Sequence, residues 1–444
     1  MRPPTGLRAR APAAAREDRL VSSMGWGVAF VLGQLGSQPW DSAAMDAVPP
    51  FLPDAEPVNI LCMDGGGIRG RNQVVIVEEL EAALGWPVAE QFDLVAGTSI
   101  GGCGALFVAK YGARATAMAR TAMRELQLQC FAQPSRRQLL SQGHLCRDAR
   151  REFMIELCGP DEDLALPPSH SPRAFALSSR LVGSSYNPTA LLEPFLFRTY
   201  EPPPDSSALP GTSRAELWRA VAATSAAPFM FPRATLGAMR LTDGGLVAND
   251  PTLVAIQEAA ALWPDRPLGL VVSLGTGEED DGSEDGLSSA REAQRSARIA
   301  AAVRARGVPN GTAYYRLQPS LLEDISPIEI DEPRLSRMEA ATREAFRGSA
   351  SAAALLAQMR RRRRAAEQSR PDWGDLRRSP LDLDLDRTSA ASPDLINGGL
   401  GRYGPVDPGA VWGGGGGGAA ARHSSTRRGW SGTVGRRARL GAFS

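Results

Sequence analysis

Ser99 lies in a run of residues that is typical of a hydrolase nucleophile. The run GTSIG, residues 97–101, comes directly after the apolar segment 92–96 and directly before a stretch of helical character. A serine on a sharp turn between a strand and a helix needs small neighbours because the backbone is crowded there, and Gly97 and Gly101 supply them. The pattern predicts a nucleophilic serine, with a phosphate-binding or merely tight turn as the alternative.

A nucleophilic serine needs a base, and the sequence favours Asp243 over a histidine. The usual base is a histidine oriented by a carboxylate. The chain has only three histidines, and none of them follows a predicted core strand. Asp243 ends a short predicted strand and is followed by Gly244 and Gly245. Although such a run alone usually marks a turn, a carboxylate that accepts the serine proton directly is the simplest base. Asp64 is the rival, but its place in a glycine loop suggests that it holds the geometry of that loop.

A second glycine-rich segment, DGGGIRG at residues 64–70, connects a predicted strand to a predicted helix. Glycines there let the backbone approach a ligand closely, and N–H groups at a helix start favour negative charge. Gly65, Gly67 and Gly70 match the spacing of a dinucleotide-binding fingerprint, which also expects an acidic residue at the end of the next strand. Asp93 has the right separation but begins its strand. An oxyanion hole and a plain structural turn are the other two interpretations.

The elements that must position these residues are short apolar strands that alternate with amphipathic helices. This alternation predicts βαβ units around a largely parallel sheet, and therefore an α/β fold. The predicted strands are 58–63, 92–96, 174–181, 239–242 and 268–274, and the predicted helices are 73–84, 101–111, 115–130, 216–223 and 251–262.

The two ends of the chain differ in composition from the middle. Residues 1–55 are rich in Ala, Pro and Arg and predict a leader or linker, either disordered or targeting the protein to an organelle. Residues 367–444 include a run of six glycines and predict a low-complexity tail. Residues 56–366 are therefore expected to form the folded domain, with a helical extension at its C-terminal end. No apolar run approaches the ~20 residues that a membrane span requires.

Charge and cysteine content exclude several classes of protein. The net charge of the 444 residues is +1, so the charge balance gives no reason to expect a nucleic acid partner. The five cysteines include no CxxC pair, which favours reduced thiols and a reducing, intracellular compartment. No His/Cys cluster has the spacing of a metal site, so no metal is expected. The acidic segment 278–285 lacks the spacing of a calcium loop, and a solvated loop is favoured.

Taken in order, the three motifs resemble those of the patatin-like phospholipase family. DGGGIRG is similar to the oxyanion loop of that family, GTSIG to its nucleophile elbow, and the Asp-Gly-Gly at 243–245 to its dyad aspartate. The resemblance extends over about residues 58–346 and is nearest to the gamma type of the calcium-independent phospholipase A2 branch. It departs from the family at Asp250, where asparagine is common, and at Ile100, where threonine is also frequent. Further similar segments lie at residues 197–200, 223–229, 243–277 and 314–317.

The resemblance implies a specific fold and site. The fold would be a three-layer α/β/α sandwich with a mainly parallel central sheet. Ser99 and Asp243 would form the catalytic dyad, and the backbone N–H groups of Gly65, Gly66 and Gly67 would form the oxyanion hole. Arg69 is expected to hold the loop or a phosphate. The supporting residues would be Arg69, Gly70, Gly97, Gly101, Gly244 and Gly245.

The resemblance also implies an activity. The protein would be a lipid acyl hydrolase of the phospholipase A type, which cleaves fatty acyl esters of glycerophospholipids through an acyl-enzyme without calcium or another cofactor. Its expected partners are a phospholipid or other acyl lipid and, transiently, a membrane surface, with no nucleic acid. A transacylase, a neutral-lipid lipase and a catalytically silent lipid-binding scaffold remain as alternatives. The segment 228–231 lines the acyl groove, inserts at an interface or belongs to the core, and the core is favoured.

Overall fold

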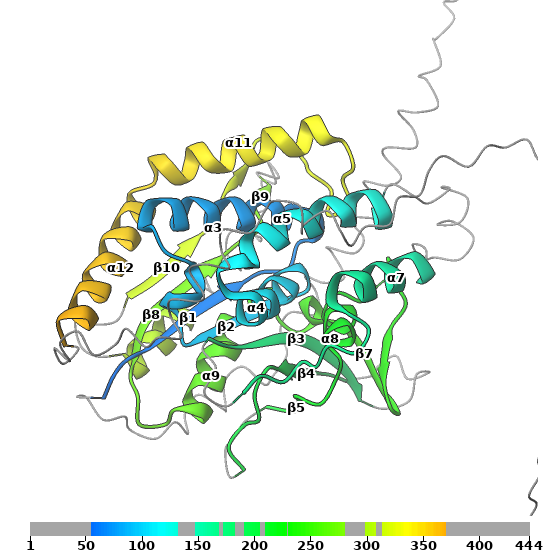
Figure 1. Ribbon diagram of the computed structural model, residues 1–444, viewed down its shortest axis with the longest axis horizontal. Coiled ribbons are helices and arrows are strands. Elements are labelled where there is room, and N and C mark those ends of the chain that lie inside the picture. Colours follow the sequence, from blue (N-terminus) through cyan, green and yellow to red (C-terminus); the bar gives the residue numbers. More distant parts are fainter. Residues whose placement is uncertain are drawn as a thin grey trace, which may run out of the picture. The chain divides into compact units, whose positions relative to one another are not determined.

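Figure 1 shows the fold as a computed structural model, in which a central sheet is covered by helices on both faces. The structure describes residues 55–131, 147–167, 172–182, 191–204, 209–228, 230–279, 298–307 and 313–369. Within these residues the main sheet has nine strands. Seven of them follow one another in the order β10 (Ala313–Leu317), β8 (Leu268–Leu274), β1 (Val58–Met63), β2 (Leu94–Thr98), β3 (Arg173–Val182), β4 (Leu191–Arg198) and β5 (Gly211–Thr212).

The sheet is parallel through its centre and antiparallel on one side. The pairs β10–β8, β8–β1, β1–β2 and β2–β3 are all parallel. β4 then runs antiparallel to β3. The remaining strands, β6 (Ala234–Leu236) and β7 (Met239–Asp243), form an antiparallel pair, and β7 also runs antiparallel to β3. A mainly parallel α/β sheet, as expected, is therefore confirmed.

The three layers follow from the alternation of side chains along the strands. In β1, Leu61 and Met63 pack into one buried cluster, while Ile60 and Cys62 pack into another. Successive side chains of a strand point to opposite faces, so each cluster belongs to one face of the sheet. The helices of the first cluster are α3 (Arg71–Leu84), α4 (Ile100–Tyr111), α11 (Glu332–Gly348) and α12 (Ala350–Ser369), and α9 (Thr252–Leu262) belongs to the second.

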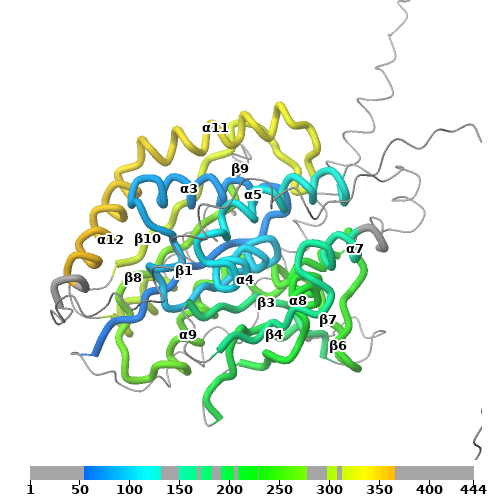
Figure 2. The backbone as a smooth tube through the Cα atoms, in the orientation of Figure 1, coloured from blue at the N-terminus to red at the C-terminus, as the bar shows by residue number. Residues whose placement is uncertain are grey.

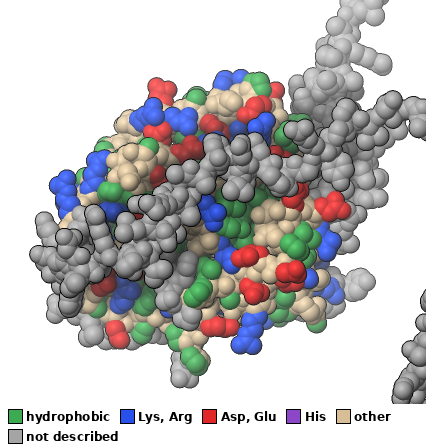
Figure 3. Space-filling view, in the orientation of Figure 1, with side chains coloured by type: hydrophobic (Ala, Val, Ile, Leu, Met, Phe, Trp, Pro, Cys, Tyr) green, Lys and Arg blue, Asp and Glu red, His purple; other side chains and the backbone are tan. Residues whose placement is uncertain are grey.

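Ion pairs hold helix α11 against α3. In Figure 2, α3 and α11 run side by side although they are more than 200 residues apart in the sequence. Arg347 Nε of α11 lies 2.7 Å from Glu79 Oε2 of α3, and Arg343 Nε lies 3.0 Å from Glu79 Oε1. Glu78 pairs with Arg120 of α5 (Ala115–Glu125) at 2.6 Å. Acidic and basic side chains are also interspersed across the face shown in Figure 3.

Several element boundaries differ from the prediction, and several elements, among them β4 and α7 (Arg147–Cys158), were not predicted. The strand predicted at 92–96 lies at Leu94–Thr98, so the serine turn follows it without a gap. The helix predicted at 115–130 is α5 followed by a π-helix, η4 (Leu126–Phe131). β4 was missed because Pro194 lies within it, and proline disfavours a strand. Helix α7 was also missed.

Some sequence predictions concern residues outside the described ranges. The leader expected at 1–55, except its last residue, and the tail from 370 onward both lie there, as do the three histidines and most of the acidic segment 278–285. Among the described cysteines, all four carry free thiols, as expected: Cys62, Cys103, Cys130 and Cys158. None of the helices in the described ranges is both long and apolar enough to cross a membrane.

Candidate active site

Ser99 occupies a sharp turn between β2 and α4. Its φ of 54° and ψ of −120° make it the one non-glycine residue with a positive φ in the described part of the chain. Such a conformation is strained and persists where the surrounding structure enforces it. A Cβ on Gly97 would lie 2.0 Å from the carbonyl oxygen of Gly101, and one on Gly101 would lie 2.2 Å from that of Met63. The turn therefore requires both glycines.

The carboxylate of Asp243 lies within hydrogen-bond distance of this serine. Ser99 Oγ donates a hydrogen bond of 2.7 Å to Asp243 Oδ2. The other carboxylate oxygen, Oδ1, accepts a hydrogen bond of 2.8 Å from the backbone N–H of Gly245. Ser179 Oγ donates to the backbone carbonyl of Asp243 at 2.8 Å, which fixes the end of β7. The structure thus brings the predicted nucleophile and the predicted base together.

The contact arises because β2 and β7 meet head to head beside β3. β2 pairs in parallel with residues 173–177 of β3, and β7 pairs antiparallel with residues 178–180. β4 occupies the other edge of β3 over the same residues, so β2 and β7 must share one edge. Since they run in opposite directions along it, their C-terminal ends point at each other. Ser99 follows one of these ends and Asp243 forms the other.

Burial makes Asp243 a stronger base than an ordinary aspartate. The residue is only 7% exposed, and the loss of water around the carboxylate raises its pKa to about 6. The hydrogen bonds from Ser99 and Gly245 and the positive charge of Arg150 act in the opposite direction. The carboxyl group is therefore ionised at neutral pH and binds a proton more readily than it would in water.

Thr224 supports the serine turn, a role that was not predicted from the sequence. Its hydroxyl oxygen accepts a hydrogen bond of 3.0 Å from the backbone N–H of Ser99, and its hydroxyl group donates to the backbone carbonyl of Leu177 in β3. The residue lies at the end of α8 (Leu217–Thr224). It belongs to the segment 223–229 that carried part of the family resemblance, which was the only signal for it.

Asp64, the rival base, is held by an arginine. Its two carboxylate oxygens accept hydrogen bonds of 2.9 and 2.6 Å from Nη1 and Nη2 of Arg316, in β10. Arg316 Nη1 also donates to Ser273 Oγ of β8 at 2.8 Å. Asp64 is 3% exposed, and its backbone carbonyl accepts from Gln73 Nε2 at 3.0 Å. These contacts anchor the glycine loop to the edge of the sheet and leave Asp243 as the carboxylate that contacts Ser99.

The glycine loop after β1 lies directly against the dyad. A Cβ on Gly65 would lie 3.2 Å from Ser99 Cβ, and one on Gly66 would lie 2.2 Å from Thr276 Oγ1. Gly67 has a φ of +58°, and a Cβ on it would lie 2.2 Å from the backbone carbonyl oxygen of Pro327. The N–H of Gly65 donates to the carbonyl of Asn249 at 3.2 Å. Gly65 was predicted to belong to the oxyanion hole, but its N–H is already used in this hydrogen bond within the fold. Of the three predicted donors, only the N–H groups of Gly66 and Gly67 donate to no residue in the described ranges.

A comparison with known families agrees with this geometry. Residues 61–256 match the family model described as patatin-like phospholipase, and this range includes the glycine loop, the serine turn and Asp243. Over residues 61–256 the chain therefore resembles a patatin-like phospholipase domain. The matched range ends within α9, and the described structure continues beyond it through β8, β10 and the two C-terminal helices.

Curated relatives of the patatin-like domain are phospholipases. Phospholipase A I of Arabidopsis thaliana is 28% identical over 275 residues, which are 50% of this chain and 21% of the relative. Calcium-independent phospholipase A2-gamma of Mus musculus is 27% identical over 295 residues, 64% of this chain and 37% of the relative. The chain thus spans about a fifth to two fifths of the length of these relatives. A solved structure, human GIVD cytosolic phospholipase A2, aligns with a TM-score of 0.37 and 14% identity over 78% of this chain and 67% of that chain.

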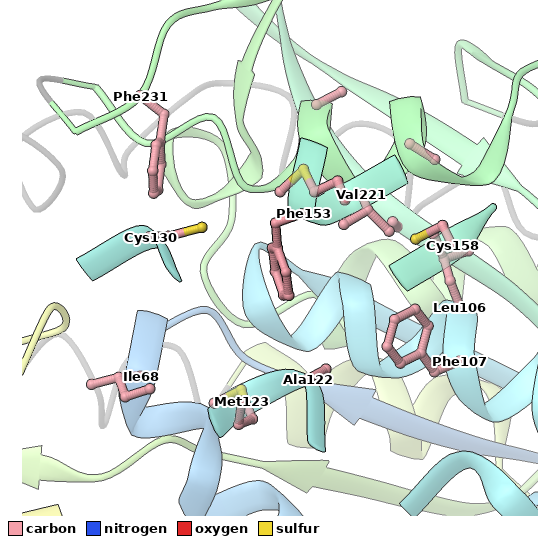
Figure 4. Close-up of a cluster of buried hydrophobic side chains, with 14 of the residues drawn as sticks. Ile68, Leu106, Phe107, Ala122, Met123, Cys130, Phe153, Cys158, Val221 and Phe231 are labelled. Carbon is pink, nitrogen blue, oxygen red and sulfur yellow. The ribbon is translucent and has the colours of Figure 1, made fainter. Parts of the chain in front are cut away.

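A largely apolar cavity of about 420 Å³ opens beside the dyad of the patatin-like domain. Gly66, Ser99 and Asp243 form one wall of it. The rest is lined mainly by apolar side chains, several of which belong to the buried cluster in Figure 4, including Phe107, Met123, Phe153, Val221 and Phe231. Sites for apolar ligands have this character, with few polar groups and many hydrophobic ones.

The segment 228–231 contributes to this cavity. Pro228, Met230 and Phe231 line it, while Phe229 lies outside the described residues. Phe231 is also 7% exposed and stacks on Phe131 with ring centroids 6.3 Å apart. The segment therefore lines the cavity, and Phe231 also belongs to the buried core, which the sequence favoured.

The remaining predicted residues lie around the dyad with different contacts. Arg69 and Gly70 line the cavity, and Gly70 packs against Ile100 at the start of α4. Gly244 lies against the backbone of β3, where a Cβ would be 2.2 Å from the carbonyl oxygen of Leu177. No group of three or more His, Cys, Asp and Glu side chains that could hold a metal occurs within the described ranges.

Proposed function

We propose that the protein hydrolyses fatty acyl esters of glycerophospholipids, as a phospholipase A that requires no calcium. The observation that carries this proposal is the 2.7 Å hydrogen bond from Ser99 to Asp243 at the wall of a largely apolar cavity, which suits an acyl chain. The patatin-like family model and the phospholipase relatives support the choice of a phospholipid as the substrate.

In the first half of the reaction the acyl group moves to the enzyme. Ser99 Oγ attacks the ester carbonyl carbon while its proton passes to Asp243 Oδ2. The carbonyl oxygen becomes an oxyanion, which the N–H groups of Gly66 and Gly67 stabilise, and each such donor contributes on the order of 2.7–4 kcal/mol. The bond to the leaving alcohol then breaks, and that alcohol takes the proton from Asp243. An acyl ester of Ser99 remains.

In the second half, water removes the acyl group. A water molecule attacks the acyl-enzyme carbonyl and gives its proton to Asp243, so that a second oxyanion forms in the same hole. Collapse of this intermediate breaks the bond to Ser99 Oγ, which recovers the proton from Asp243. The fatty acid leaves and the dyad returns to its initial state. If another alcohol takes the place of water, the same steps give transacylation.

The dyad is tested by two nearly isosteric substitutions. Ser99→Ala and Asp243→Asn should each abolish release of fatty acid from phosphatidylcholine vesicles in the presence of a calcium chelator, while circular dichroism remains unchanged. Ser336→Ala and Asp265→Asn are matched controls because both positions are exposed. Full activity in either dyad variant would disprove the mechanism. Loss of activity on adding the chelator to the wild-type protein would disprove calcium independence.

The substrate class needs a separate measurement. Mixed vesicles of phospholipid and triacylglycerol, with a different labelled fatty acid in each lipid, show which ester is cleaved. Predominant release from the phospholipid is expected. Predominant release from the triacylglycerol would indicate a neutral-lipid lipase, and transfer of label to an added monoacylglycerol would indicate a transacylase. A fluorophosphonate probe that failed to label Ser99 would favour a catalytically silent scaffold.

Transient contact with a membrane surface is part of the proposal. Leu128 and Ile330 are large apolar side chains that are 46% and 49% exposed. Gln127 Nε2 donates to the carbonyl of Ile330 at 3.0 Å, so the two segments are neighbours, and each also contributes a cavity-lining residue, Leu126 and Pro327. A membrane that covers these side chains would lie next to the cavity. Replacing both by aspartate should weaken binding to vesicles while hydrolysis of a soluble short-chain ester is retained; undiminished vesicle binding would refute this contact.

A further inference from the structure

Arg150 is a buried cation in the apolar cavity, and the mechanism above does not use it. It lies in α7, lines the same cavity as Ser99 and Asp243, and is 6% exposed. No carboxylate among the described residues forms a hydrogen bond or an ion pair with it. Removing a charge from water without a partner of opposite charge is costly, so an arginine in this setting needs an explanation.

The contacts that Arg150 makes satisfy only part of its guanidinium group. Nη2 donates to the carbonyls of Ala222 at 3.0 Å and Ser225 at 2.9 Å, and to Ser225 Oγ at 2.9 Å. Nε is buried without a hydrogen-bond partner, and Nη1 donates to no residue in the described ranges. The guanidinium stacks on the ring of Phe231, 4.1 Å from its centroid, which compensates for some of the lost hydration.

The surroundings keep this group charged but give it no anion to bind. Burial lowers the pKa of Arg150 to about 10, so it remains a cation at neutral pH. Asp243 attracts it at a distance but directs its two carboxylate oxygens to Ser99 and Gly245. Two nitrogens of a rigid, planar donor are thus held next to the dyad without an acceptor.

We propose that Arg150 binds an anionic oxygen group of the lipid substrate beside the dyad. The inference rests on the proposed function, since the cavity must hold an acyl lipid. Two parts of such a lipid carry this chemistry, namely the phosphate of the headgroup and a carboxylate at the far end of an oxidised acyl chain. Guanidinium groups bind both with paired N–H donors. Arg69 lies in the glycine loop and lines the same cavity. The anion site at Arg150 would therefore be a second contact, in addition to any contact that Arg69 makes with a phosphate.

Binding to an inactive variant tests this without relying on hydrolysis. The full chain with Ser99→Ala is titrated with oleoyl lysophosphatidic acid and with mono-oleoylglycerol, both below their micelle-forming concentrations, in a calorimeter. A second pair consists of glycerol monoesters of nonanedioic and nonanoic acid. Introducing Arg150→Met into the Ser99→Ala protein should weaken binding of the anionic ligand of one pair by about 10- to 100-fold. Binding of the neutral ligand of the same pair should change by less than about threefold. Arg150→Lys should restore part of the loss.

The outcomes distinguish the headgroup phosphate from the acyl-chain carboxylate, and they test the anion site separately from the proposed hydrolysis. A selective loss for the phosphate ligand assigns the site to the headgroup, and a selective loss for the dicarboxylic monoester assigns it to the acyl chain. Equal losses for charged and neutral ligands, or no loss at all, would overturn the proposal. Arg151→Met is the matched control, since Arg151 is the exposed neighbour on the same helix. A wild-type protein that binds these ligands but hydrolyses no ester would refute the proposed function and leave the anion site standing.

Discussion

Asp243→Asn should make the protein more stable at neutral pH while removing its activity. The pKa of Asp243 in the folded protein is about 6, above its usual value of 3.8, because burial penalises the charged form. The folded state therefore holds the proton more tightly than the unfolded state. The stability associated with this group is fully present below pH 3.8 and is lost as the pH rises through about 6.

The size of this effect follows from the two pKa values. At about 1.4 kcal/mol for each pH unit, the difference between 3.8 and about 6 corresponds to about 3 kcal/mol of destabilisation once the carboxylate is ionised. Asparagine has nearly the same shape, can still accept the Gly245 N–H, and can donate its amide N–H to Ser99 Oγ. The variant thereby avoids the cost of the buried charge. Loss of the attraction to Arg150 reduces the gain, so an increase in Tm of roughly 3–6 °C at pH 8 is expected.

The assay is thermal unfolding of wild type and variant between pH 4 and pH 8. The difference in Tm should be close to zero at the acid end and should grow through about pH 6. In parallel, kcat/KM of the wild type should rise across the same range with a one-proton dependence, because only the ionised carboxylate accepts the serine proton. A difference in Tm that does not change with pH, or a wild type that is the more stable protein at pH 8, would refute the argument.

Three further substitutions probe the oxyanion hole, the serine turn and the core. Gly66→Ala places a Cβ 2.2 Å from Thr276 Oγ1 and should lower kcat by about 10²–10³-fold as the loop moves, measured on a soluble ester. Thr224→Val removes the acceptor of the Ser99 N–H, which costs about 1–3 kcal/mol of stability in chemical denaturation and should also lower kcat. Glu258→Gln breaks the buried pair with Arg198 and should cost about 3–5 kcal/mol of unfolding free energy.

Each of these substitutions has a matched control in the chain. Gly348→Ala should be neutral, since no atom lies within 4 Å of the position of its Cβ. Thr224→Ser keeps the hydroxyl group and should retain most of the activity. Glu201→Gln breaks an exposed ion pair with Arg214, which is worth about 0–1 kcal/mol. An alanine at Gly66 with normal kcat, a valine at Thr224 with normal stability, or equal costs for the two glutamates would each contradict the corresponding argument.

The sequence is sufficient to predict the contact between Ser99 and Asp243 because its signals are local. The serine turn needs glycines at fixed positions, and an aspartate at the end of a strand is visible in the one-dimensional pattern. The α/β class follows in the same way, since β1 and β8 are mostly apolar segments of a parallel sheet buried on both faces. Features that depend on one residue and its immediate neighbours can therefore be predicted before the structure is known.

The contacts that complete the site are not local, and the sequence does not reveal them. Arg316 reaches Asp64 across 252 positions, and Thr224 reaches Ser99 across 125. The direction of β7 is equally hidden, since a short strand pairs as readily in one direction as in the other until its neighbours are known. Arg150 is hidden for another reason: in the sequence it is one of many arginines, and only burial distinguishes it. Tertiary packing decides all four cases.

In the proposed mechanism, burial also explains how Asp243 can serve as the base in place of a histidine. A general base works best when its pKa lies near the pH at which the enzyme operates. An aspartate in water, with a pKa near 3.9, is too weak a base, whereas a histidine, near 6.5, is well placed. The head-to-head meeting of β2 and β7 encloses Asp243 and raises its pKa to about 6, close to that of an imidazole. The same desolvation that destabilises the fold thus supplies the basicity that the reaction needs, and the stability and activity of the Asp243→Asn variant should change in opposite directions for this one reason.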